Sequence, residues 1–172
     1  MTDTLLGPAL VEEATKKSGL IWVRGAQGDA PAARALWHVW HEGAAHVVGD
    51  GPGEQPLPGL VAGSTAEVTV RSKDKGGRVV AWTAAVSELA PGTEEWDAAV
   101  AELKGKRLNA TDGEAMPERW ARECRVLRLA PLDSTTDLPT GSLAAVPQPS
   151  DALTRRPAPA ALPRLLLKRR RR

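Results

Sequence analysis

The stretch ARALWHVWHEGAAHVVGDG, residues 33–51, decides the fold. Its two apolar runs on either side of Glu42-Gly43 predict a β-hairpin that turns at this pair. Because side chains alternate along strands, one face of the hairpin holds Trp37, Val39, His41, Ala44, His46 and Val48, and the other Leu36, His38, Trp40, Ala45 and Val47. Both faces are largely apolar, so we expect both to be covered, as in a barrel wall that packs on a second subunit.

Segments on both sides of the hairpin extend it to a small antiparallel barrel. Helices are expected at residues 3–18, 93–105 and 117–123, and further strands at 20–25, 66–72, 77–89 and 124–132. Thr93 is a suitable N-cap for the second helix. Consecutive strands joined as hairpins, with helices at the edges, indicate an antiparallel barrel of the α+β class.

The charge of the chain divides it into two parts. Residues 151–172 carry eight Arg or Lys and one Asp, so the net charge of +2 leaves −5 for the preceding 150 residues. We therefore expect a folded domain at 1–132 and, at 133–172, a disordered Pro/Ala-rich tail that ends in a polybasic run. That tail is either a charged end without a role or a weak contact for nucleic acid or an anionic surface.

The cysteine count and the absence of targeting signals bear on where the protein is expected to be located. There is one cysteine, Cys124, which excludes an internal disulfide and is expected to be a small packing residue. No signal pattern and no membrane-length apolar run is evident, so a cytoplasmic protein is expected. The abundance of Ala, Gly, Pro and Arg hints at an actinobacterial source.

The three histidines are the obvious metal candidates. His38 and His41 should point to opposite faces of a strand, while His41 and His46 can share one. No carboxylate or cysteine is placed to complete a set of ligands, so we expect no metal site.

A basic turn, VRSKDKGGR at residues 70–78, is the strongest cluster of positive charge in the folded part. Arg71, Lys73 and Arg78 could converge on a phosphate. Gly76-Gly77 is also what a hairpin turn requires, so a solvated hairpin tip is the alternative.

Residues 5–131 as a whole resemble the split β-barrel flavoproteins of the pyridoxamine 5′-phosphate oxidase-like superfamily. The resemblance rests on the strand order and on the stretches LWHVWHEGAAHVVGDGPGEQPLPGL, TVRSKDKGGRVVAWTAAVSELAPG and RWARECRVLRLAP. It implies a split β-barrel homodimer with cofactor clefts at the subunit interface. Each cleft would hold FMN or a deazaflavin and a small-molecule substrate.

The family's phosphate contacts are only partly present in this chain. In the family motif Arg-x-Val-Leu-Leu-Lys, the first position falls on Arg34 and the lysine position on Val39. The family's Ser-Arg-Lys run falls on Gly53, Glu54 and Gln55. Because a carboxylate repels a phosphate, either backbone amides of residues 49–53 hold the phosphate or no FMN binds.

Two main functions remain open from the sequence. The first is a flavin-type oxidoreductase, and the second is a non-catalytic split-barrel module for binding or assembly. A weaker third has the barrel dimerise while the tail recruits nucleic acid. The candidate cofactor contacts are Arg34, Asp50, Gly51, Gly53, Glu54, Gln55, Arg71, Lys73 and Arg78.

Overall fold

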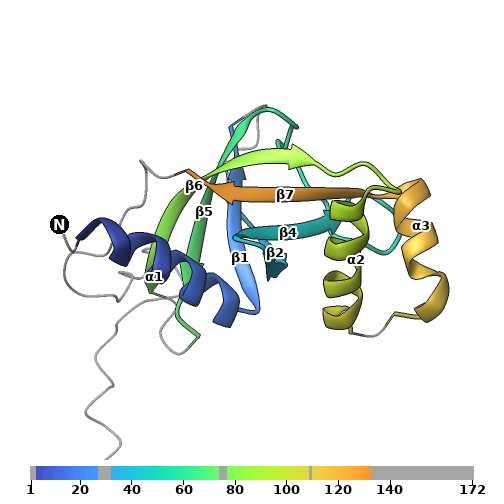
Figure 1. The fold of residues 1–172 in the computed structure, drawn as a ribbon, viewed down its shortest axis with the longest axis horizontal. Helices are drawn as coiled ribbons and strands as arrows, with labels where there is room; N and C mark the ends of the chain where they lie inside the picture. The colour runs from blue at the N-terminus through green and yellow to red at the C-terminus, as the bar shows by residue number, and fades with distance from the viewer. Residues whose placement is uncertain (1–2, 27–31, 74–76, 109, 133–172) are drawn as a thin grey trace, which may run out of the picture.

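The computed structural model describes residues 3–26, 32–73, 77–108 and 110–132 (Figure 1). The helices are α1 (Asp3–Lys17), α2 (Glu94–Lys106), the 3-10 turn η1 (Gly113–Ala115) and α3 (Met116–Glu123). The strands are β1 (Leu20–Gly25), β2 (Arg34–Trp37), β3 (Val39–His41), β4 (Ala44–Gly49), β5 (Thr65–Arg71), β6 (Arg78–Glu88) and β7 (Arg125–Pro131). Each expected helix and strand is present with small shifts of its ends, and the predicted tail lies outside the described residues.

One segment of chain closes the barrel. The sheet runs in the order β2-β1-β5-β6-β7-β4-β3, so β2 and β3 lie at its two edges although His38 alone separates them in sequence. The edges therefore meet, and the twisted sheet curls into a barrel. The predicted hairpin is confirmed by the pairing of Val39 with His46 and of His41 with Ala44. The expected single strand is instead divided, since β2 turns to pair with β1.

The side chain of Gln55 fills the gap that this division leaves. Continuing the β3–β4 register would place Trp37 opposite Val48. Instead, the Gln55 amide accepts from the Trp37 N–H at 2.9 Å and donates to the Trp37 carbonyl at 2.9 Å and the Val48 carbonyl at 3.2 Å. A side-chain amide thus replaces backbone pairing where the barrel splits.

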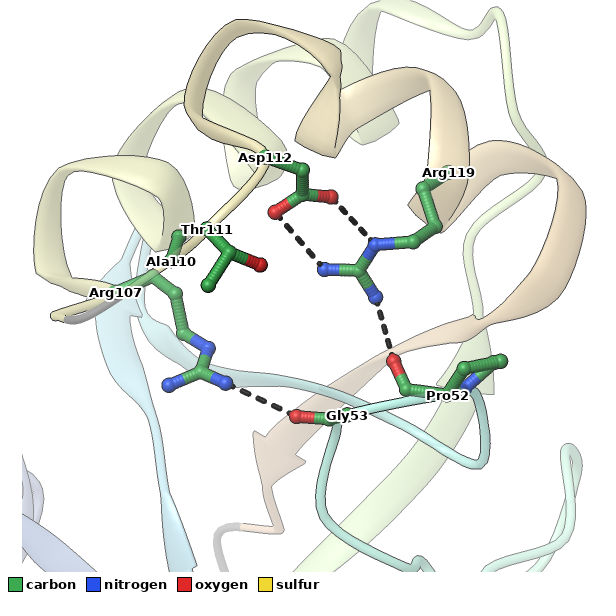
Figure 2. A pocket seen from close by; sticks show the side chains of 7 residues that line it. All are labelled: Pro52, Gly53, Arg107, Ala110, Thr111, Asp112 and Arg119. Atoms are coloured by element: carbon green, nitrogen blue, oxygen red, sulfur yellow. Dashed lines mark hydrogen bonds and ion pairs between the residues drawn. The ribbon is translucent and has the colours of Figure 1, made fainter.

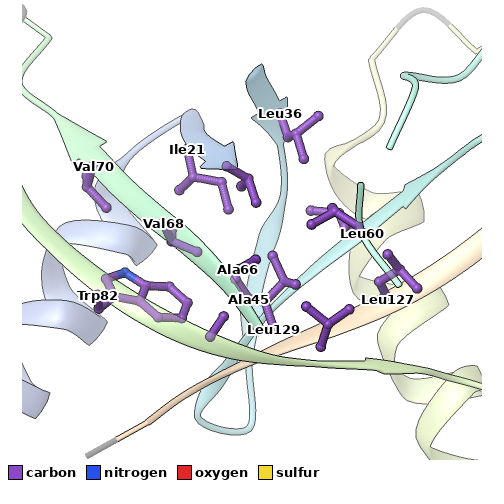
Figure 3. Packing of buried hydrophobic residues seen from close by; sticks show 14 of the residues in the cluster. Ile21, Leu36, Ala45, Leu60, Ala66, Val68, Val70, Trp82, Leu127 and Leu129 are labelled. Carbon is purple, nitrogen blue, oxygen red and sulfur yellow. The ribbon is translucent and has the colours of Figure 1, made fainter. Parts of the chain in front are cut away.

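Two apolar clusters lie on the two sides of the barrel wall. The first fills the barrel and includes Trp82 and Leu129 (Figure 3), with Val11 of α1 packed into it. The second joins the outer face of the β3–β4 hairpin to α2 and α3 and includes Trp96 and Trp120. Tryptophan supplies the aromatic bulk of both, because the chain has no Phe and no Tyr.

The covered faces of the central hairpin are confirmed, but the cover differs from the one expected. All six residues of β4 are buried, by the barrel interior on one side and by the cluster with α2 and α3 on the other. A single chain therefore covers both faces, because the helices that follow β6 fold back onto the hairpin. The burial of this hairpin gives no argument for a second subunit.

His38 holds α1 against the barrel. Its ring is 1% exposed, and its Nε2 lies 2.9 Å from the carbonyl of Thr15 in the last turn of α1. Because a carbonyl only accepts, Nε2 carries the hydrogen. His38 is therefore a buried polar residue at the point where the chain passes from β2 to β3.

Gln55→Glu should destabilise the barrel at its split. The substitution keeps the shape but directs a carboxylate at two carbonyl oxygens, which lose a donor and gain a repulsive neighbour. We expect the free energy of unfolding to fall by about 3 kcal/mol, measured by urea denaturation. Glu67→Gln, an acid–amide exchange in an exposed pair with Arg24, is the control and should change it by less than about 1 kcal/mol. Equal effects would contradict the role of Gln55.

Candidate functional site

The loop that follows β4 is shaped by Asp50 and Gly51. Asp50 has a φ of 60°. Its N–H donates to the Gln55 carbonyl at 2.9 Å, and its Oδ1 accepts from the Leu57 N–H at 2.7 Å. A Cβ on Gly51 would lie 2.3 Å from the Cys124 sulfur, so only glycine fits there. Cys124 packs against the α2–α3 cluster, as expected for a small packing residue.

Glu54 is a buried carboxylate with two cations around it. Its side chain is 0% exposed, and its Oε1 accepts from the Trp120 indole N–H at 3.0 Å. Arg119 Nη2 lies 3.1 Å from Oε1, and Arg107 Nε lies 3.2 Å from Oε2. Two guanidinium groups and an indole therefore offset the cost of burying this charge.

The same two arginines hold the backbone of the loop. Arg107 donates to the Gly53 carbonyl at 3.0 Å, and Arg119 donates to the Pro52 carbonyl at 2.8 Å. Arg119 also pairs with Asp112, with 2.6 Å between Nε and Oδ2. Its hydrogen bonds to Asp112, and then to Glu54, raise the pKa of the Arg119 guanidinium above its usual value. The Arg119 guanidinium in turn lowers the pKa of Asp112.

A pocket of about 430 Å³ opens beside these groups (Figure 2). Its lining includes Gly53, Arg107, Thr111, Asp112 and Arg119, and we call it the loop pocket. A guanidinium has five N–H donors, and the internal bonds of Arg107 occupy Nε, one position on Nη1 and one on Nη2. Arg107 therefore keeps N–H groups for a ligand, while Glu54 and Asp112 neutralise the formal charge of the two arginines.

The sequence did not reveal the two arginines of the loop pocket. It predicted the loop residues Asp50, Gly51, Gly53, Glu54 and Gln55, and the structure brings these together. Arg107 and Arg119, from the end of α2 and from α3, lie 53 and 65 positions from Glu54. Glu54 is thus a buried carboxylate whose cationic partners come from distant parts of the sequence.

The remaining candidate residues lie elsewhere. Arg34 is exposed at the start of β2, opposite Val23 of β1. Arg71 and Lys73 line a separate pocket of about 320 Å³ together with Lys17 of α1, which we call the α1 pocket. Arg78 pairs opposite Arg71 across β5 and β6. The structure therefore distributes the nine predicted contacts over three places in one chain.

His41 and His46 line a third pocket, of about 240 Å³, which we call the histidine pocket. The rings of His41 and His46 are 6.1 Å apart, so their predicted shared face is confirmed. Burial first, and then the nearby Arg128 and His41, lower the pKa of His46 to about 4. Within the described ranges, no group of three or more His, Cys, Asp or Glu is arranged to hold a metal ion.

The closed sheet, with α1 at one side and α2 and α3 at the other, defines a protein with the split β-barrel fold of the α+β class (Figure 1). No protein-family model and no curated protein sequence matches the chain. Among the helices that the structure describes, none is long and apolar enough to cross a membrane.

Solved structures confirm this fold. HutZ, the heme storage protein of Vibrio cholerae, matches with a TM-score of 0.52 and 12% identity over 74% of this chain and 91% of that chain. A candidate pyridoxamine 5′-phosphate oxidase of Listeria innocua matches at 0.51, with 12% identity over 76% and 96%. A candidate general stress family protein of Xanthomonas campestris pv. campestris matches at 0.51, with 17% identity over 87% and 99%. At these identities the similarity shows the fold alone.

Glu54→Gln should leave two guanidinium groups without their shared counter-charge. We expect the free energy of unfolding to fall by about 3–5 kcal/mol, as when a buried ion pair loses one partner. Glu118→Gln, in an exposed pair with Arg122 on α3, is the matched control and should cost less than about 0.5 kcal/mol. Chemical denaturation measures both, and similar losses would show that Glu54 is not the anchor of the loop.

The stability of the protein should fall in acid partly through His46. Its pKa of about 4 in the fold lies below its ordinary value of 6.5, so the unfolded chain binds more protons between these pH values. The stabilisation is complete above pH 6.5 and is lost as the pH falls toward 4, by roughly 3 kcal/mol. His46→Gln should flatten the curve of unfolding free energy against pH in that window. Parallel curves for both proteins would contradict this assignment.

Proposed function

We propose that the protein binds a flavin-type cofactor, FMN or a deazaflavin, and transfers electrons or hydride to a small-molecule substrate. The observation that carries the proposal is the pair Arg107 and Arg119 at the loop pocket. Both reach the loop on which the family resemblance places the cofactor phosphate, and both line the pocket there. They supply guanidinium N–H donors at a loop whose own sequence has no basic residue.

The residues of the loop pocket fit one end of such a cofactor. A volume of about 430 Å³ is within the range of small-molecule sites. The remaining N–H groups of Arg107, together with the Thr111 hydroxyl, would donate to phosphate oxygens. Asp112 opposes binding, because its carboxylate lines the same pocket and pairs with Arg119. A phosphate would therefore compete with Asp112 for that guanidinium.

The fold would contribute orientation, and the cofactor would contribute the redox chemistry. Glu54 fixes both guanidinium groups from the protein side, so their direction is set before a ligand arrives. We further propose a cytoplasmic homodimer, in which a second subunit completes each cleft, as the family resemblance implies. The half-exposed Leu20 on the outer side of β1 is an apolar residue that such an interface would cover.

A non-catalytic module is the second candidate function. It is favoured by the fact that Arg107 and Arg119 already bond to the carbonyls of Gly53 and Pro52 and to two carboxylates. In that case the arginines only anchor the loop to α2 and α3, and the barrel serves for binding or assembly. Cofactor titration separates the two functions.

Titration of the full chain with FMN and with a deazaflavin, followed by absorbance, tests the proposal. Asp112→Asn should tighten FMN binding roughly fivefold, since removing one charge near the phosphate is worth about 1 kcal/mol, and Arg107→Gln should weaken it. Arg122→Gln, on the exposed side of α3, is the control and should change nothing. A protein that binds neither FMN nor the deazaflavin, or an Asp112→Asn variant with unchanged affinity, would favour the non-catalytic module.

A further inference from the structure

The α1 pocket is lined by basic and apolar side chains without a carboxylate. Lys17, Arg71 and Lys73 supply three positive charges, and Ala14, Val70 and Val79 form the apolar part of its lining. None of the described lining residues is acidic. This contrasts with the loop pocket, where two carboxylates neutralise two arginines.

Arg71 is held in place by stacking on an aromatic ring, which does not occupy its N–H donors. Its guanidinium carbon lies 4.1 Å from the centroid of the Trp22 ring, on the neighbouring strand β1. Stacking of this kind fixes the plane of a guanidinium and leaves the N–H groups at its edge for another acceptor. A planar, fixed group with several free donors suits an oxyanion.

Arg78 lies directly opposite Arg71 in the β5–β6 register. The register also shifts between Val70 and Arg71.

The acidic partner of Lys17 is weakly held. Glu13 pairs with Lys17 at 2.8 Å, but the two side chains are 57% and 78% exposed. Exposed pairs one helical turn apart contribute only about 0.3–0.5 kcal/mol. Lys17 can therefore exchange Glu13 for a ligand at little cost.

We propose that the α1 pocket binds the phosphate group of a small organic phosphate. Arg71 donates N–H groups from its fixed plane, and Lys17 and Lys73 add charge that matches a dianion. The apolar side chains of Ala14, Val70 and Val79 contact the organic part of the ester, which favours an organic phosphate over inorganic phosphate.

The α1 pocket is distinct from the proposed cofactor site. The two pockets share no lining residue. Figure 1 shows α1 and the α2–α3 pair on different sides of the sheet. The proposal does not depend on flavin binding, because its argument uses only Lys17, Arg71, Lys73 and their surroundings.

Calorimetric titration of the full chain with phenyl phosphate and with inorganic phosphate tests the proposal. We expect phenyl phosphate to bind several-fold more tightly than inorganic phosphate, and both to weaken as salt rises. Arg71→Gln with Lys73→Gln should weaken both by at least tenfold. Trp22→Leu should weaken them about three- to five-fold, the value of an exposed cation–π contact. Arg122→Gln, which removes a positive charge from the exposed side of α3, is the control and should have no effect.

Three outcomes would overturn the assignment of a phosphate site to the α1 pocket. These are absence of binding of either phosphate at millimolar concentration, unchanged affinity in the Arg71/Lys73 double variant, or loss of binding in Arg107→Gln instead. Because the side chains at positions 71 and 73 are on the surface, the double variant should fold normally. Circular dichroism checks that it does. If FMN binding is lost in the double variant and kept in Arg107→Gln, the phosphate site is supported and the loop pocket is not the cofactor site.

Discussion

The fold depends on a single segment, residues 34–41, that belongs to both edges of the sheet. β2 pairs with β1 and β3 pairs with β4, and the chain changes partner at His38. At that change the N–H and carbonyl of Trp37 bond to the side-chain amide of Gln55, which bridges them to β4. Without such a group, an unpaired peptide would remain at the seam of the barrel, which is costly when buried. The position of Gln55 in turn determines where the loop after β4 must lie.

Once Gln55 is fixed, its neighbour Glu54 is directed toward the helices. A carboxylate in that direction is stable only with cationic partners, and Arg107 and Arg119 supply them from α2 and α3. Buried ion pairs add little net stability, but they are sensitive to geometry and so discriminate between alternative packings. The aromatic contact between Trp37 and Trp120, with centroids 6.4 Å apart, is apolar and far less directional. The charged cluster therefore specifies how the helix pair sits on the barrel.

The local features of the fold could be predicted from the sequence, and the long-range ones could not. Alternation of side chains correctly assigned the faces of the hairpin, and Thr93 caps α2 through a bond from the Trp96 N–H at 3.3 Å. The exchange of partner at His38 could not be predicted, because the same alternating pattern fits a strand with one neighbour or two. The arginines that pair with Glu54 are also invisible locally, since Arg119 lies in a stretch that reads as an ordinary surface helix.

The loop pocket and the α1 pocket differ in whether their cations are already paired with buried carboxylates, and this difference bears on function. In the loop pocket the arginines are held by buried and part-buried carboxylates, so a ligand gains a fixed geometry but little net attraction. In the α1 pocket the cations are exposed and less constrained, so a ligand gains attraction and long-range steering that salt weakens. Recognition of a cofactor by shape would suit the first arrangement. Capture of a small phosphorylated ligand that binds and leaves again would suit the second, and Trp22 adds the one rigid element that such a site needs.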